Sequence, residues 1–237
     1  NSFNEVEDFV SRNKKASLHE VTRCGVRGLQ RLFLDIDAKY TDFPDITKEQ
    51  INSAYNVLLQ SVFEILYFNI VAPVGATSTQ TALNDDAFFL DGSREDKFSM
   101  HVVYKNIYID GEHYSCICKE IIDNFTRNLE FEQLPSQLVK IIDVGVYGRN
   151  HCVRIHTSRK FGTDHRLILK DDHTAAFNKE TLVTYKPHLL NGAQYYKCSD
   201  GCTGLEQIKH QSNITDEGLL QIEQVLDGLK EFGITVR

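Results

Sequence analysis

The sequence predicts an α/β fold of the α+β kind, in which amphipathic helices and short strands share one core. Three stretches place apolar residues at the helical period: 3–10, 51–66 and 117–125. Three other stretches alternate with the period of two that sends successive side chains to opposite faces of a strand: 33–37, 97–104 and 152–156. A chain of 237 residues with 41% hydrophobic residues is long enough to bury such a core.

Composition narrows the class of protein. No apolar run reaches the ~20 residues that cross a bilayer, and the first residues lack the basic-then-apolar pattern of a secretory signal. We therefore expect an intracellular protein with no membrane partner, whose six cysteines are reduced thiols. The net charge of -7 disfavours indiscriminate binding to nucleic acid but permits a local basic groove. Since the chain starts without Met and stops just after a helical pattern, we expect a domain cut from a longer polypeptide.

After a short helix over residues 2–14, the first informative stretch is the apolar run 32–37, which contains two carboxylates. On a strand, Asp35 and Asp37 project to the same face. Two adjacent negative charges repel unless a cation lies between them, and paired carboxylates suit magnesium or manganese. A strand end with merely solvated acids is the alternative.

The residues before that strand, 23–31, hold three arginines and two glycines. A solvated loop and a basic loop that contacts a polyphosphate or a nucleic-acid backbone are both compatible with this pattern. Further on, Thr47 and Gln50 form a capping box, which predicts a long core helix that ends near Asn69. Residues 70–83 are typical of a loop.

The second informative stretch, 87–104, predicts strand, turn and strand. On its second strand Lys97, Ser99 and His101 share the face opposite the core. Such a row of donors suits phosphate oxygens, whereas the alternative is an ordinary exposed strand face. A turn near Asp110 then leads into a helix.

The third stretch begins with an apolar strand, 139–143, that ends in Asp143. The next strand, 152–156, places Arg154 opposite its apolar residues, and 166–170 predicts one more strand. Asp143 is followed in the sequence by a local positive patch, which consists of Arg149, Arg154, Arg159 and Lys160.

The last part of the chain carries little functional information. Residues 182–185 and 195–196 are compatible with short strands, and Thr215 caps a final amphipathic helix. Cys198, Cys202 and His210 offer three zinc ligands, but a second cysteine pair is missing, so we do not expect zinc.

In this order, the three stretches resemble the motifs of the archaeo-eukaryotic primase superfamily, closest to its PrimPol-like branch. The matches are Asp35-x-Asp37, Ser99-x-His101 and Asp143-x-Gly145-Val146-Tyr147-x-Arg149-Asn150-x-x-x-Arg154-x-x-x-Ser158-x-Lys160-x-Gly162. The likeness covers residues 30–170. Many members carry Glu at the second metal position, where this chain has Asp37, and their zinc-binding segment is not evident here.

The resemblance implies a two-lobed catalytic core, with an RRM-like mixed sheet that carries the acids, over one domain of residues 1–237 whose C-terminal part is 171–237. Its implied metal ligands and catalytic residues, for Mg²⁺ or Mn²⁺, are Asp35, Asp37 and Asp143. Its implied nucleotide-binding residues are Lys97, Ser99, His101, Arg154 and Lys160. Candidates for contact with a template strand, which needs a positive track, are Arg23, Arg27, Arg31, Arg149, Arg159 and His151.

The expected function is therefore template-directed nucleotidyl transfer on single-stranded DNA, which synthesises or extends primers from nucleoside triphosphates. The setting would be a nuclear or cytoplasmic replication site, with a helicase domain or subunit as a further partner. Two alternatives remain open from the sequence. One is a non-catalytic nucleic-acid-binding initiation module with a structural metal, and the other is a metal-dependent nuclease.

Overall fold

The computed structural model describes residues 3–13, 16–22, 24, 28–67, 86–148, 150–170, 176–185 and 194–195. The chain divides into two units, 1–206 and 207–237, and all the described residues belong to the first. The predicted loop at 70–83, the final helix and the cysteines at 198 and 202 lie outside them.

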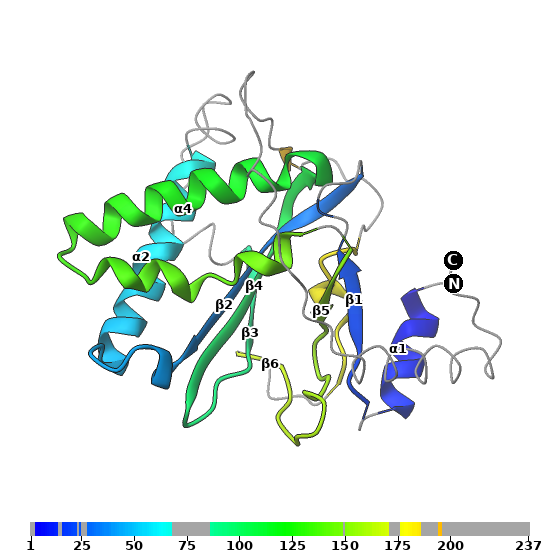
Figure 1. The fold of residues 1–237 in the computed structure, drawn as a ribbon. Helices are drawn as coiled ribbons and strands as arrows, with labels where there is room; N and C mark the ends of the chain where they lie inside the picture. Colours follow the sequence, from blue (N-terminus) through cyan, green and yellow to red (C-terminus); the bar gives the residue numbers. More distant parts are fainter. Residues whose placement is uncertain are drawn as a thin grey trace, which may run out of the picture. The chain divides into compact units, whose positions relative to one another are not determined.

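A five-stranded mixed sheet lies at the centre of this unit (Figure 1). Its strands, in spatial order, are β2 (Leu29–Lys39), β4 (Lys97–Asp110), β3 (Ala87–Asp91) and β6 (Ile168–Leu169), and β7 (Gln194–Tyr195) also pairs with β4. Neighbouring strands are antiparallel except for β4 and β7, which are parallel. The architecture confirms the predicted α+β class and the mixed sheet.

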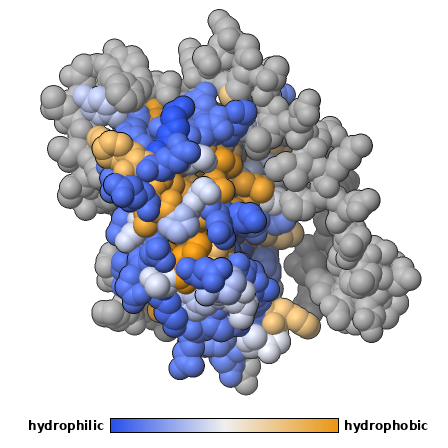
Figure 2. Space-filling model, turned by 60° about the vertical axis from the view of Figure 1, so that its left-hand side comes forward, coloured by the Kyte–Doolittle hydropathy of each residue, from blue (hydrophilic) through white to orange (hydrophobic). Residues whose placement is uncertain are grey.

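Two long helices, α2 (Lys48–Leu66) and α4 (Tyr114–Phe131), pack against each other beside this sheet (Figure 1). The start of α2 is the predicted one, because the Thr47 hydroxyl accepts a hydrogen bond from the Gln50 amide while the Gln50 side chain accepts one from the Thr47 amide. Seen from the side where these helices lie, the surface is mostly hydrophilic, with hydrophobic residues between the polar ones (Figure 2).

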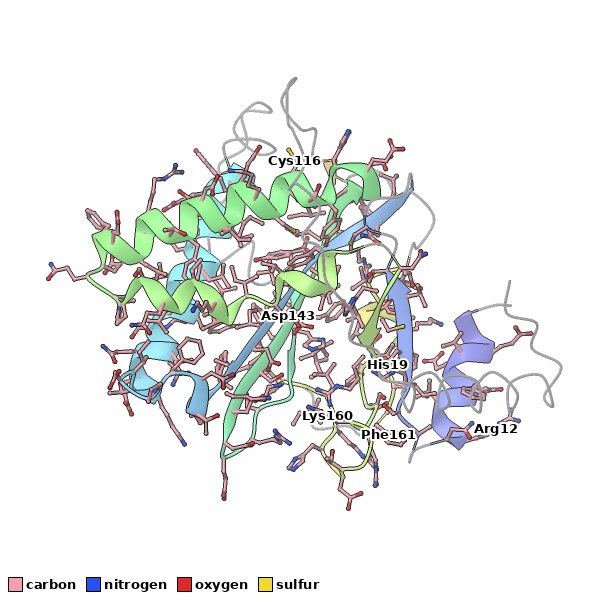
Figure 3. All side chains as sticks on the ribbon, viewed as in Figure 1. Arg12, His19, Cys116, Asp143, Lys160 and Phe161 are labelled. Carbon is pink, nitrogen blue, oxygen red and sulfur yellow. The ribbon has the colours of Figure 1, made fainter. Side chains whose placement is uncertain are left out.

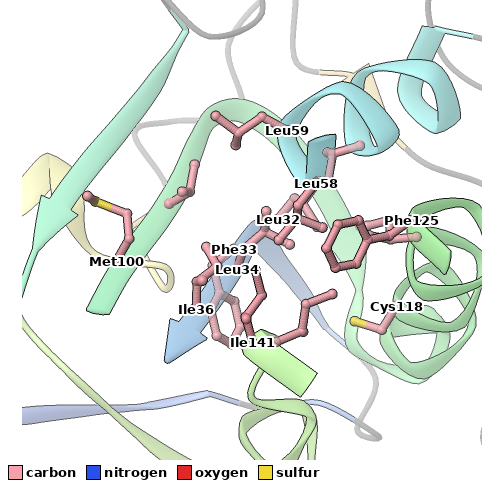
Figure 4. Packing of buried hydrophobic residues seen from close by; sticks show 14 of the residues in the cluster. Leu32, Phe33, Leu34, Ile36, Leu58, Leu59, Met100, Cys118, Phe125 and Ile141 are labelled. Atoms are coloured by element: carbon pink, nitrogen blue, oxygen red, sulfur yellow. The ribbon is translucent and has the colours of Figure 1, made fainter. Parts of the chain in front are cut away.

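The apolar positions of β2 anchor the strand in the core (Figure 4). Leu32, Leu34 and Ile36 are at most 1% exposed and share a buried cluster with Leu58 of α2 and Phe125 of α4. Burial of each such side chain stabilises the fold by about 1.5–3 kcal/mol. Because side chains alternate along a strand, the intervening carboxylates are held on the other face of the sheet.

A two-stranded ribbon lies beside the main sheet and consists of β1 (His19–Thr22) and β5 (His151–Arg154). Helix α1 (Phe3–Arg12) contributes Val10 to a small second core with Ile155, Phe177 and Leu182. The amide of Leu18 donates to Ser158 Oγ at 2.6 Å, which closes the base of the ribbon.

Residues 176–185, which include the 3₁₀-helix η7 (Lys179–Thr181), tie the ribbon to the sheet. The carboxylate of Glu20 in β1 accepts hydrogen bonds from the amides of Val183 and Thr184, each at 2.9 Å. The guanidinium of Arg31 in β2 donates to the Glu180 and Leu182 carbonyls and is only 3% exposed. The expectation that Arg31 contacts a template is therefore wrong, since its donors serve this connection.

Several predicted strands differ in the structure. Residues 139–143 do not form a strand: the 3₁₀-helix η5 (Ser136–Ile141) occupies most of this stretch, and only Ile142 bridges to Ile36. The strand predicted at 166–170 shortens to β6, and residues 182–185 follow η7 without strand structure. The other short 3₁₀-helices are η1 (Tyr40–Asp42), η4 (Gly111–His113) and η6 (Val144–Tyr147).

Among the cysteines that the structure describes, one departs from the expectation. Cys24, Cys118 and Cys152 are free, whereas Cys116 is disulfide-bonded, so the prediction of six reduced thiols is wrong for Cys116. Among the helices described, none combines the length and the apolar composition required to cross a membrane.

Candidate active site

The pairing of β2 with β4 joins the first two sequence motifs into one surface. In the antiparallel register Asp35 lies directly opposite His101, and Asp37 lies opposite Ser99. Residues opposite each other on one face have Cβ atoms about 4.5–5.5 Å apart, so their side chains interact. The two carboxylates, the imidazole and the hydroxyl therefore form a single patch on the face away from the helices.

The third motif reaches this patch through its backbone. The amide of Asp143 donates to the Asp35 carbonyl at 2.9 Å, and the amide of Asp35 donates to the Tyr147 hydroxyl at 3.3 Å. The Asp143 carboxylate caps η6 by accepting a hydrogen bond from the Gly145 amide at 2.9 Å. Asp143 is thus fixed beside Asp35 although no continuous strand carries it.

These residues line a cleft of about 370 Å³. Figure 3 shows Asp143, His19 and Lys160, from three separate segments, around this space. The lining includes three carboxylates, Asp35, Asp37 and Asp143. It also includes four cationic side chains, Arg94, Lys97, Arg154 and Lys160, and four histidines, His19, His101, His151 and His165. In a protein of net charge -7, this cleft is thus a place where cationic side chains outnumber the acids.

Lys97 forms an ion pair with Asp37 at one end of the patch. Its side chain is nearly buried, and this burial, together with the neighbouring charge of Lys160, lowers the pKa of Lys97. A lysine whose protonation is disfavoured by a neighbouring cation is stabilised by an anion between the two. The position of Lys97 and Lys160 therefore suits a bound polyanion.

Asp35 and His101 form the buried centre of the patch, with Oδ1 and Nε2 3.4 Å apart. Burial raises the pKa of Asp35 to about 7, and the negative charge of Asp143 adds to this effect. Burial also lowers the pKa of His101 to about 3, with a further contribution from the positive charges of Arg154 and Lys97. The imidazole is therefore neutral, and its buried Nδ1 has no hydrogen-bond partner among the described residues.

Arg154 reaches the main sheet from the ribbon, over Gly92. A Cβ atom at Gly92 would lie 2.7 Å from a guanidinium nitrogen of Arg154 and 3.3 Å from both Leu167 Cδ1 and Ser99 Oγ. Glycine is thus the residue that lets the guanidinium approach Ser99 closely. The arrangement brings a positive charge from the ribbon to the turn after β3 in the main sheet.

We expect Gly92→Ala to weaken binding of inorganic tripolyphosphate about ten-fold while leaving the melting temperature nearly unchanged. The added methyl group displaces the end of a flexible side chain, so the anion site loses Arg154 and the core does not. Isothermal titration and thermal melting measure the two effects. In an Arg154→Ala background the same substitution should have no further effect. Additive losses would show that Gly92 acts independently of Arg154.

The acids have the chemistry of a site for a hard divalent cation. Oxygen ligands suit Mg²⁺ and Mn²⁺, and the repulsion of Asp35 by Asp143 is the kind of interaction that a bound cation relieves. Within the described ranges, however, no group of three or more His, Cys, Asp or Glu side chains is already placed to hold a metal. The ion pair with Lys97 also occupies Asp37, so the carboxylates must rearrange to share a cation.

In metal-free buffer, Asp35→Asn should raise the melting temperature at pH 8 by several degrees. The pKa of Asp35 is raised in the fold from its ordinary 3.8 to about 7, so this carboxyl lowers the stability of the fold progressively as pH rises from about 4 to 7, and the loss is complete above pH 7. Asn removes this charge, and each kcal/mol gained raises the melting temperature about 2–4 °C. The gain should shrink toward pH 4. The exposed Asp123→Asn is the control, and an equal shift at pH 4 and pH 8 would contradict the argument.

The structure brings eight of the predicted site residues together in one cleft: Asp35, Asp37, Lys97, Ser99, His101, Asp143, Arg154 and Lys160. The alternative of an exposed strand face is wrong for Lys97, Ser99 and His101, which are 8%, 5% and 6% exposed. His151 also lines the cleft.

The structure locates fewer of the arginines that were predicted to contact a template strand. Arg23, Arg27 and Arg149 lie outside the described residues. Arg159 is described and forms an ion pair with Asp164, outside the cleft lining. Its contact with a template stays a prediction.

Sequence reasoning missed several residues of the cleft: His19, Gly92, Arg94, Phe161 and His165. His19 is opposite Arg154 in the ribbon, and only the pairing of β1 with β5 places it there. Comparison with known proteins adds no further residue, since no family model and no curated protein match this chain.

Proposed function

We propose that this protein is a metal-dependent nucleotidyltransferase, which primes or extends DNA on a single-stranded template. The observation that supports the proposal most directly is the register of β2 and β4, in which Asp35 and Asp37 oppose His101 and Ser99. The backbone bond from Asp143 to Asp35 adds the third acid of the resemblance described above. On this proposal the fold is a primase core with an RRM-like sheet in one of two lobes.

Asp35, Asp37 and Asp143 would hold Mg²⁺ or Mn²⁺. When bound, the metal supplies activation of the primer 3'-hydroxyl and neutralisation of charge at the α-phosphate. The strand and the 3₁₀-helix that carry the carboxylates keep them on one wall of the cleft. Charge that develops during the in-line displacement would thus arise beside a fixed set of ligands.

The cations of the cleft would hold the triphosphate. Lys97 and Lys160 are close enough to depress protonation of Lys97, and Arg154 reaches the same surface from the ribbon. Arg154 can bind phosphate oxygens with two parallel N–H groups, whereas each lysine acts as a point charge. Ser99 and the neutral imidazole of His101 would orient the nucleotide by uncharged hydrogen bonds.

A template strand would enter from the same cleft and present unpaired bases to the incoming nucleotide. The arginines proposed for its backbone are Arg23, Arg27, Arg149 and Arg159. A helicase domain or subunit would supply such single-stranded DNA at an intracellular replication site.

One observation favours the non-catalytic binding module as a second candidate. Lys97 already neutralises Asp37, as a structural cation would, so the acid pair is partly satisfied without metal. Such a module would bind nucleotides or single-stranded DNA but would transfer no nucleotide.

The deciding experiment combines single-stranded template, labelled nucleotides and either Mg²⁺ or Mn²⁺, with and without a primer. Metal-dependent lengthening of the primer, or new labelled strands without one, is the expected result. Binding without incorporation under every condition would favour the module. Shortening of a labelled strand would favour a nuclease instead.

A further inference from the structure

Phe161 is an aromatic side chain that does not pack in the described part of the hydrophobic core. It is 78% exposed, although it lines the cleft that holds the three acids. It belongs to neither of the buried apolar clusters described above. Figure 3 shows it beside Lys160 at the cleft. Its position in the lining of a charged cleft, which the equally exposed Phe131 lacks, places the ring where it can contact a ligand of that cleft.

The loop that carries Phe161 is held in place by its own hydrogen bonds. The Lys160 amide donates to the His165 carbonyl at 2.9 Å, and the Thr163 amide donates to the Lys160 carbonyl at 3.0 Å. Gly162 takes the turn with φ of +74°, a conformation that other residues rarely adopt. Arg159 and Asp164 pair across the loop. The ring is therefore presented from a defined turn and loses little conformational freedom when it binds.

Phosphate-binding and aromatic groups meet at this loop. Lys160 precedes Phe161 directly, lines the same cleft and is close enough to Lys97 to lower its pKa. His165, from the other side of the loop, also lines the cleft. A ligand that satisfies these groups carries phosphates and, one sugar away, a flat apolar ring, which is the chemistry of a nucleotide.

We propose that Phe161 is the stacking platform for a nucleobase in this cleft. The inference rests on the proposed function for its ligand class and adds the residue that recognises the base. Stacking on an aromatic face is available to every base, so the platform favours a nucleotide over a bare polyphosphate without choosing among the four bases. The base can belong to the incoming nucleotide or to an unpaired template strand.

The chain contains no tryptophan, which allows a direct spectroscopic test. Phe161→Trp introduces one indole at the proposed platform, and Phe131→Trp introduces one at a position that is 82% exposed and does not line the cleft. Nucleoside triphosphates, or oligothymidylate where the template base occupies the platform, should quench the fluorescence of the first variant only. Inorganic tripolyphosphate, which has no base, should bind without quenching it. Quenching by tripolyphosphate as well, or equal quenching of both variants, would overturn the platform.

Affinity supplies the second measurement. Loss of one base stack is expected to weaken binding of the ligand whose base stacks there, a nucleoside triphosphate or a single strand, about 5- to 150-fold in Phe161→Ala, and to leave tripolyphosphate binding unchanged. Phe161→Tyr should retain wild-type affinity, and Phe131→Ala should behave as wild type. Because both phenylalanines are exposed, the melting temperature should not change, which separates lost stacking from misfolding.

The two sources of the base are distinguished with oligothymidylate and an abasic strand of the same length. A loss confined to oligothymidylate in Phe161→Ala assigns the platform to the template strand, and a loss confined to nucleotides assigns it to the incoming nucleotide. Unchanged affinity for both overturns the inference but leaves the proposed function standing. Wild-type protein that binds neither nucleotides nor single-stranded DNA would overturn both.

Discussion

Nucleotide incorporation should fall about a thousand-fold or more when Asp35 or Asp143 is replaced by Asn. Each carboxylate is expected to hold the metal that neutralises charge in the transition state, and loss of about 4 kcal/mol of that stabilisation slows the reaction by this factor. Asp37→Asn should have an effect of the same kind. Primer extension with saturating nucleotide and metal measures the rate.

The fold should survive these substitutions, because the carboxylates lie in the cleft while Leu32, Leu34 and Ile36 anchor the strand. Thermal melting and the matched surface variant Asp123→Asn, which removes an exposed carboxylate from α4, provide the controls. Near-normal synthesis by either the Asp35 or the Asp143 variant would refute the proposed metal site.

Lys97→Met should weaken nucleoside triphosphate binding about ten-fold to over a hundred-fold, because a lost charge-assisted hydrogen bond costs about 1.5–3 kcal/mol. Methionine retains most of the length and apolar character of the lysine stem, so the change is mainly one of charge. Titration calorimetry measures the affinity. Lys119→Met is the control, since Lys119 forms only an exposed ion pair with Asp123 on α4.

A purely structural role for Lys97 predicts a different pattern. If its ammonium serves only to neutralise Asp37, Lys97→Met should lower the melting temperature and leave nucleotide affinity intact. In that case the double variant Lys97→Met/Asp37→Asn should recover the lost stability. Restored stability together with wild-type affinity would exclude Lys97 from the nucleotide site.

The sequence could predict the parts of the site that depend on local periodicity. Alternation places Asp35 with Asp37, and Lys97 with Ser99 and His101, because a strand has only two faces. The start of α2 was equally predictable, since the capping box of Thr47 and Gln50 is formed by neighbours in sequence. In these cases the information lies within a few residues.

Features that depend on partners distant in sequence could not be predicted. The apolar stretch before Asp143 has strand composition, yet it forms η5 and bridges β2 through Ile142 alone. Arginine usually lies at the surface. The burial of Arg31 is explained only by its hydrogen bonds to the carbonyls of residues 180 and 182, which are distant in sequence. Nor does alternation distinguish a strand face that meets solvent from a buried one, such as the face that carries Lys97, Ser99 and His101.

The connection made by residues 176–185 sets a lower limit on the size of a working fragment. Every sequence motif ends before residue 170, so a truncated protein that stops there would contain all the groups of the cleft. It would lack the amides that bind Glu20 and the carbonyls that bind Arg31. The ribbon that carries Arg154 and His19 would then lack these contacts to the segment that joins it to β2. Fragments prepared for crystallisation or inhibitor screening should therefore extend beyond Tyr185.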